Sequence, residues 1–139
     1  MRFVLLAALS VAIAACGGAP PTGLAAELPG STWTLERVVL PDDGGVLRGD
    51  GERVSFAADG SLTVSSCNAC SGTYRVRRGQ LEPGPLACTR RGCPADAVEL
   101  ERFFSGPLAM RRDGAYLVLD AITDDADGAQ ILLVPAGTP

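Results

Sequence analysis

The chain has 139 residues, of which 47% are hydrophobic, and its 12 basic residues stand against 16 acidic ones. This length and apolar share suit one compact domain rather than two. A net charge of −4 without a basic run argues against a nucleic-acid partner and against electrostatic binding to anionic lipid. All 12 basic residues are arginine and histidine is absent, which excludes histidine bases, Ser-His or Cys-His nucleophile pairs and histidine metal ligands.

The N-terminal stretch MRFVLLAALSVAIAAC starts with the basic Arg2 and is apolar from Phe3 to Ala15, with Ser10 as the only break. Such a run is too short to span a bilayer as a helix, which takes about 20 residues. Its length and flanks are typical of the apolar region of a signal peptide. We therefore predict that residues 1–15 are a signal peptide that processing removes.

The end of this stretch, IAAC at 13–16, resembles the lipobox of bacterial lipoproteins, in which cleavage precedes a cysteine that carries a diacylglycerol. Of the five cysteines, setting Cys16 aside leaves an even number, which suits an oxidising compartment. We therefore expect lipidation at Cys16, and an exported protein held on a membrane of the cell envelope, facing the periplasm or the exterior. Ordinary secretory cleavage after a small-x-small site is the alternative.

Residues 16–30 have glycine and proline at both ends and no periodic pattern between them, which predicts a flexible tether behind the lipid. The folded domain is then expected to cover residues 31–139. It opens with the alternating run STWTLERVVL, which predicts a strand, followed by a Gly/Asp-rich loop over 41–52.

Two β-hairpins are expected next, because alternating runs surround Asp59-Gly60 and again meet near Arg78-Gly79. Another hairpin is predicted about Asp113-Gly114, followed by a last strand, ILLVP. Between these two, TDDADG at 123–128 resembles half of a calcium loop but lacks the bidentate glutamate, so we expect an ordinary acidic turn.

One helix is expected to begin at Cys93, because Pro94 suits a first helical position and apolar side chains follow at helical spacing up to Phe104. Ser105-Gly106-Pro107 would end it. Strands, one helix and further strands predict an α+β domain: a small antiparallel β-sheet or open barrel with one packed helix.

The remaining cysteines have the spacing Cys67-x2-Cys70-x17-Cys88-x4-Cys93. A zinc-binding module is one interpretation, but the second pair is too widely spaced for a usual zinc knuckle. A thiol–disulfide oxidoreductase using Cys67 and Cys70 is another, but its reactive thiolate would need a helix N-terminus, and here a β-run follows.

Two structural disulfides are the favoured interpretation of these four cysteines. The nested connectivity, Cys67–Cys93 with Cys70–Cys88, would fasten the expected helix start and its preceding loop to a central strand. The alternative, Cys67–Cys70 with Cys88–Cys93, closes two small loops and constrains the fold less.

A series of short motifs runs through the domain: WTL at 33–35, SFAADG at 55–60, CN at 67–68, GTY at 72–74, LACTRRGCP at 86–94, Glu99 before Phe103-Phe104, and LVL at 117–119. In this order, the motifs resemble the META domain family, to which the HslJ-type heat-inducible proteins belong. The resemblance implies a small α+β domain on a signal peptide or lipid anchor, with stress-related envelope roles and no established catalytic activity.

The resemblance also supports pairing Cys67 with Cys93, because both family positions often carry cysteine. The sequence departs from the family at Ser66, where glycine is usual, and in the extra pair Cys70 and Cys88. Asn68 is expected to order the turn beside Cys67 rather than to bind a ligand.

The sequence favours a non-enzymatic, lipid-anchored envelope domain that is stress-related or binds a partner. It contacts the membrane through its N-terminal lipid and binds a protein or small molecule that the sequence does not identify. We predict no catalytic residue, no cofactor and no metal ligand. The oxidoreductase and the zinc module are the alternatives.

Overall fold

The computed structural model describes residues 22–122 and 128–137. Two short helices and ten strands follow in chain order: α1 (Leu24–Glu27), β1 (Ser31–Val39), β2 (Val46–Arg48), β3 (Arg53–Phe56), β4 (Ser61–Ser65), β5 (Ala69–Arg77), β6 (Gln80–Pro83), β7 (Ala87–Cys88), the 3-10 helix η1 (Leu100–Phe104), β8 (Leu108–Asp113), β9 (Tyr116–Ala121) and β10 (Gln130–Pro135).

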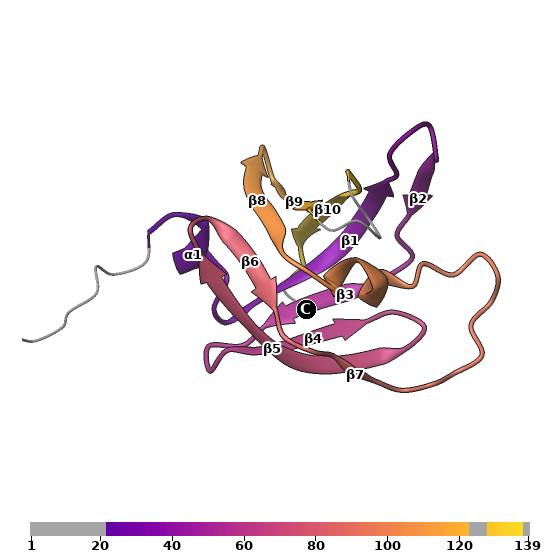
Figure 1. The fold of residues 1–139 in the computed structure, drawn as a ribbon, viewed down its shortest axis with the longest axis horizontal. Helices are drawn as coiled ribbons and strands as arrows, with labels where there is room; N and C mark the ends of the chain where they lie inside the picture. The colour runs from indigo at the N-terminus through magenta and orange to yellow at the C-terminus, as the bar shows by residue number, and fades with distance from the viewer. Residues whose placement is uncertain (1–21, 123–127, 138–139) are drawn as a thin grey trace, which may run out of the picture.

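Eight of the strands close an antiparallel barrel in the order β1-β3-β4-β5-β6-β8-β9-β10 (Figure 1). The last strand, β10, returns to pair with β1 from Trp33 opposite Pro135 to Val39 opposite Gln130. β2 and β7 are short additional strands, which pair with the second half of β1 and the start of β5. Closure removes the free edges that an open sheet of these strands would have.

Alternation of apolar and polar residues explains the barrel core. In β3 and β4 the inward positions are Val54, Phe56, Leu62 and Val64, all fully buried, while the residues between them are more exposed. The ring of Phe56 packs edge-on against Tyr74 of β5, with 5.1 Å between ring centroids. Because successive strand residues point to opposite faces, the same alternation continues round the barrel.

The expected hairpins about Asp59-Gly60, Arg78-Gly79 and Asp113-Gly114 are confirmed. At the second of these turns Arg78 and Gly79 both have positive φ, 51° and 75°. This backbone twist matches the twist of the paired strands, which is why two-residue turns of this kind join them closely.

The expectation of an α+β fold with one packed helix is wrong, since the described residues are nearly all β and the barrel is closed. No helix begins at Cys93; the chain stays irregular until η1 starts at Leu100. Two tertiary contacts oppose a helix there: Cys93 is bonded to Cys67, and the Arg91 N–H donates to the Asn68 side chain. The intrinsic helix propensity of a short segment is small, so such tertiary contacts override it.

β2 lies inside the segment that the sequence predicts to be a loop. It reaches the sheet where β1 has an irregularity between Leu35 and Arg37. Gly49 makes this approach possible, because a Cβ at that position would lie 2.1 Å from the Leu35 carbonyl oxygen. The Gly and Asp residues that suggest a loop thus flank a short strand.

The last residues of the expected tether are part of the fold. Residues 24–27 form α1, and Leu28 directly after it is fully buried in the core. The expected signal peptide, Cys16 and the acidic turn at 123–127 lie outside the described residues. Within the described ranges, no helix has the length and apolar character that a bilayer-spanning segment needs.

Candidate functional site

Two disulfides fasten one long segment to the barrel wall. Cys67 is bonded to Cys93 and Cys70 to Cys88, which is the nested connectivity. Cys70 and Cys88 also lie opposite each other in the β5–β7 ladder, so this bond joins two strands already in register. The segment between β7 and η1 loops out from the barrel and returns to it before η1 (Figure 1).

Asn68 holds the start of this segment in place between the two disulfides. Its side-chain oxygen Oδ1 accepts a hydrogen bond from the Arg91 N–H over 2.9 Å and one from the Thr89 hydroxyl over 3.4 Å. The Thr89 hydroxyl oxygen in turn accepts from the Ala69 N–H over 3.0 Å. Asn68 therefore joins two loops, beyond ordering the turn beside Cys67.

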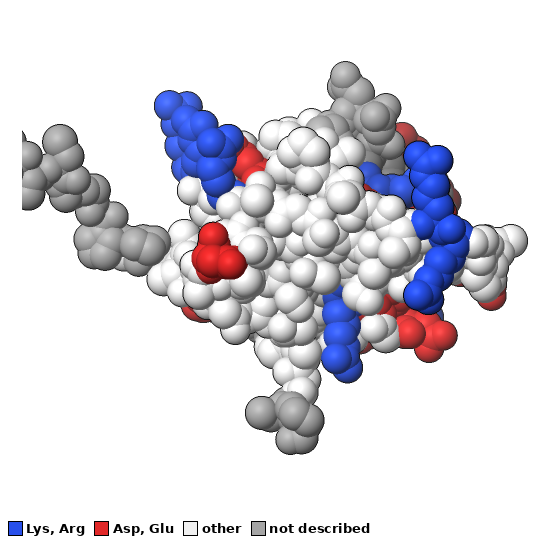
Figure 2. Space-filling view, turned by 90° about the horizontal axis from the view of Figure 1, so that it is seen from below, with Lys and Arg blue, Asp and Glu red and all other residues white. Residues whose placement is uncertain are grey.

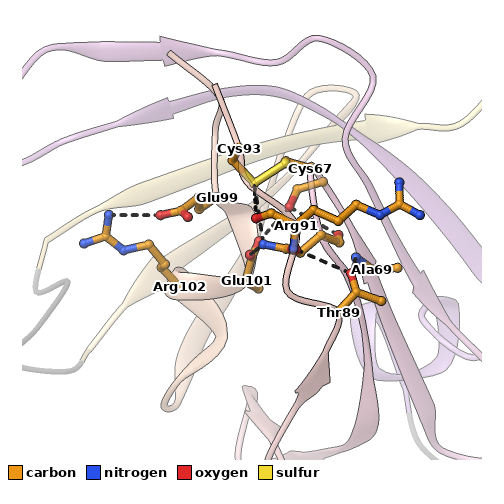
Figure 3. The surroundings of a disulfide bond; sticks show 10 residues. Cys67, Ala69, Thr89, Arg91, Cys93, Glu99, Glu101 and Arg102 are labelled. Carbon is orange, nitrogen blue, oxygen red and sulfur yellow. Dashed lines mark hydrogen bonds and ion pairs between the residues drawn. A yellow bond between two sulfur atoms is a disulfide. The ribbon is translucent and has the colours of Figure 1, made fainter. Parts of the chain in front are cut away.

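Glu101, on η1, points back toward the Cys67–Cys93 bond (Figure 3). Its Oε2 accepts from the Ser66 hydroxyl over 2.6 Å, and its Oε1 accepts from Asn68 Nδ2 over 3.3 Å. Nδ2 also lies 3.5 Å from Cys93 Sγ. We call Ser66, Cys67, Asn68, Cys93 and Glu101 the disulfide cluster.

Glu99 has a different role from Glu101, although the family motif includes Glu99. Glu99 forms an exposed ion pair with Arg102 at 3.6 Å, and its side chain points toward Arg102 in Figure 3. Sequence reasoning missed both Ser66 and Glu101 as site residues. The sequence contains little that would identify Glu101, because the direction of its side chain depends on the conformation of the segment before it, which the sequence does not predict.

Two hollows flank the disulfide cluster, and each has a volume of about 500 Å³. The first, which we call the β2 hollow, is lined by Ser66 and Cys67 from the cluster and, among others, by charged residues Arg48, Asp50, Glu52 and Asp96. The second lies between the end of β6 and η1, and its lining residues are Pro83, Gly84, Pro85, Leu86, Cys88, Glu101, Arg102, Phe104 and Ser105.

The disulfide cluster joins three chain segments through one disulfide and several hydrogen bonds. Both sulfurs are in a disulfide, so neither is the thiolate that nucleophilic attack or zinc binding requires. Both oxygens of Glu101 accept hydrogen bonds inside the cluster. In the described part of the chain, no group of three or more Cys, Asp or Glu side chains is placed to hold a metal ion.

Charges elsewhere on the surface are mixed. Arg75 and Arg77 are 73% and 61% exposed, and both lie near Glu82 at 3.6 and 3.8 Å. Figure 2 shows basic side chains at the upper left, along the right side and at the lower centre of the face it presents, around a broad uncharged centre, with acidic side chains near them.

Two ionisable groups at the β3–β4 turn have shifted pKa values. Hydrogen bonds from the side chain and the N–H of Ser61 lower the pKa of Asp59 below its ordinary value of 3.8. Burial, and then the negative charge of Asp59, raises the pKa of Tyr74, whose hydroxyl donates to the Ala57 carbonyl over 2.9 Å. Both shifts favour the protonation states found near neutral pH.

Comparison with solved structures gives the same fold. An NMR structure of a protein from Burkholderia xenovorans has a TM-score of 0.59 at 15% identity, covering 92% of this chain and all 100% of the other. A second NMR structure has a TM-score of 0.60 at 20% identity, covering 81% of this chain and 95% of the other. A search of curated proteins finds no match.

The fold and the cluster define a small antiparallel barrel domain in which two disulfides fasten the longest irregular segment of the described residues. The family model described as META domain matches residues 26–136. The chain therefore belongs to the META domain family, as the motifs between Trp33 and Leu119 indicate.

Proposed function

We propose that this META domain protein is a lipid-anchored, non-enzymatic domain of the cell envelope that works by binding a partner. The observation that carries the proposal is the pair of disulfides that fastens residues 89–99 to the barrel. Disulfides of this structural kind suit an exported protein. The apolar N-terminal stretch that ends at Cys16 supplies the expected export signal and the lipidated residue.

The contacts of the disulfide cluster support a role without catalysis. Nucleophilic catalysis by cysteine needs a free thiolate. The cysteine sulfurs are instead bonded to each other, and the hydrogen bonds that Glu101 accepts from Ser66 and Asn68 fix its carboxylate in place. The cluster serves to hold the segment before η1 against the barrel, so that the hollows beside it keep their shape.

The two hollows are the proposed places for binding, because rigid concave surfaces with a few polar groups are typical of ligand sites. The β2 hollow is the more charged of the two, and the second one is lined largely by proline and apolar side chains. The resemblance to HslJ-type proteins extends the proposal to a stress-related role at the envelope.

The proposed anchor is tested by lipid labelling in a bacterial host that processes lipoproteins. Cells supplied with labelled palmitate are expected to incorporate the label into the wild-type chain and into Ser10→Ala, which keeps the apolar run and Cys16. Cys16→Ser is expected to carry no label. Label on Cys16→Ser, or none on the wild type, would contradict the anchor.

A further inference from the structure

β2 has one unpaired edge. Among the described residues it pairs only with β1, over three positions from Val39 opposite Val46 to Arg37 opposite Arg48. Val46 is 51% exposed, which makes it the more exposed of the two large hydrophobic residues, Val46 and Ile122, that are exposed within residues 22–122 and 128–137. An exposed edge with an apolar side chain is the kind of surface that accepts another strand.

The main-chain groups of β2 that point away from β1 can be identified. The N–H of Gly49 donates to the carbonyl oxygen of Glu36 over 3.0 Å. Because hydrogen-bonded positions alternate along an antiparallel ladder, Gly49 and Leu47 direct their main-chain groups toward β1. The N–H and C=O groups of Val46 and Arg48 therefore point outward, and none of them has a main-chain partner among the described residues.

The open edge leads directly into the β2 hollow. Arg48, the last residue of β2, lines that hollow, and Asp50 and Glu52 follow it along the chain. Asp96 also lines the hollow, from the segment that the disulfides hold. Three carboxylates against one guanidinium give the hollow a net negative charge, so it attracts a cationic side chain.

We propose that β2 accepts an extended, basic peptide segment of a partner protein as an additional strand, with a basic side chain seated in the β2 hollow. Main-chain hydrogen bonds to Val46 and Arg48 supply the attachment, and the hollow supplies the preference for positive charge. This inference rests on the proposed binding function and names its partner class.

Charge also decides between a basic partner and a second copy of this chain. Pairing two β2 edges would bring together two hollows that each carry Asp50, Glu52 and Asp96. Like charges placed together disfavour such a contact. A basic segment would instead place its positive side chains beside the carboxylates of the β2 hollow.

The test uses the full lipid-bearing chain in detergent micelles and a synthetic nine-residue peptide that alternates valine and arginine. Amide hydrogen exchange, followed by NMR, is expected to slow at Val46 and Arg48 when the peptide is added. The control peptide carries glutamate in place of every arginine and is expected to bind at least about tenfold more weakly, as one lost ion pair in a desolvated site allows.

A matched pair of variants isolates the main-chain contact. Val46→Pro removes an N–H that faces outward, so it leaves the ladder with β1 intact, whereas Val46→Thr keeps that N–H. Affinity for the basic peptide, measured by fluorescence anisotropy, is expected to fall about tenfold in Val46→Pro and to stay within about twofold in Val46→Thr, since one hydrogen bond is lost only in the first. Asp96→Asn is expected to weaken binding and to reduce its dependence on salt.

The proposal is overturned by equal binding of the acidic and basic peptides, by unchanged affinity in Val46→Pro, or by exchange protection that avoids β2. It is also overturned if sedimentation shows self-association that protects Val46 and Arg48 without peptide. The failure of the lipid anchor has a separate readout, namely palmitate labelling at Cys16, so the two proposals fail in different experiments.

Discussion

Asn68 and Glu101 lie 33 positions apart in the chain and are hydrogen-bonded through Nδ2 and Oε1. Asn68 also accepts from the main chain at Arg91, so a single side chain connects the end of the β4–β5 turn, the disulfide-bonded segment and η1. Its amide offers donors and an acceptor at once, which a carboxylate does not. At the scale of single residues, Asn68 and Glu101 join the segment before η1 to the β4–β5 turn.

Removing the carboxylate of Glu101 tests the importance of this pair. Glu101→Ala removes the carboxylate that accepts from the Ser66 hydroxyl and from Asn68 Nδ2, and leaves these donors only the longer contacts with the Asn68 carbonyl and Cys93 Sγ. We expect the free energy of unfolding to fall by about 1–3 kcal/mol. Glu99→Ala is the matched control, because it removes only an exposed ion pair with Arg102, worth at most about 0.5 kcal/mol. Urea unfolding of the oxidised proteins measures both. Equal losses in the two variants would contradict the role given to Glu101.

The hydrogen bonds of Asp59 in the β3–β4 turn make the stability of the fold depend on pH in the acid range. Because the pKa of Asp59 is lower in the folded protein than its ordinary 3.8, its carboxylate contributes stability above that pH and loses the contribution as the pH falls below it. Ser61→Ala removes the side-chain hydrogen bond, so the pKa of Asp59 is expected to rise toward the ordinary value. A carboxyl titration by NMR measures it, and an identical Asp59 pKa in the two proteins would refute this assignment.

The segment between β7 and η1 is the element that the sequence describes least well. Ala97, Leu100 and Phe104 have helical spacing, and Pro94 suits a helix start. In the structure Val98 and Leu100, two positions apart, are both buried, as in an extended chain. The disulfide to Cys67 and the contact with Asn68 override the local pattern, and neither can be derived from spacing alone.

Hairpins, by contrast, are local, and the sequence predicts them correctly. Asp59-Gly60, Arg78-Gly79 and Asp113-Gly114 each carry glycine at a position with positive φ. The turn residues and the alternating strand residues that define each hairpin lie within about ten residues of one another, so a local pattern is enough to predict it. β2 was missed because its three residues are surrounded by glycine and aspartate, and its partner β1 is distant from any pattern within the loop.

Each disulfide is expected to stabilise the element it fastens. Cys67 and Cys93 are 26 positions apart and Cys70 and Cys88 are 18, so replacing either pair by alanine is expected to lower the free energy of unfolding by about 2–3 kcal/mol. Thermal unfolding of each double variant against the intact protein measures the loss. In the variant lacking Cys67 and Cys93, amide exchange is expected to speed up mainly between residues 89 and 99. Uniform acceleration over the whole barrel would contradict a local fastening.

At the scale of the whole molecule, barrel closure is the feature that no local pattern reveals. β1 and β10 are the first and last strands of the domain in sequence, and they pair with each other in the fold. The buried Leu35 and Leu133 lie opposite each other in this pairing. Each strand taken alone fits an open sheet as well as a closed one. An open sheet would expose two edges, and only the pairing of the first and last strands shows that it closes.

The residues of the candidate site are likewise only partly predictable from the sequence. The cysteines and Asn68 are visible in the sequence as short motifs, whereas Ser66, Glu101 and the acidic wall at Asp96 become neighbours only through the fold. Sequence spacing indicates that disulfides form. It does not indicate which side chains they bring beside a hollow.

The central claim, a lipid-anchored domain fastened by two disulfides, is tested most directly by one mass measurement. The protein is extracted from its native membrane, alkylated with and without prior reduction, and weighed intact. We predict a chain that begins at an acylated Cys16, with no alkylated thiol before reduction and alkylation at Cys67, Cys70, Cys88 and Cys93 after it. A chain that keeps Met1 and carries no lipid, or free thiols before reduction, would contradict the account.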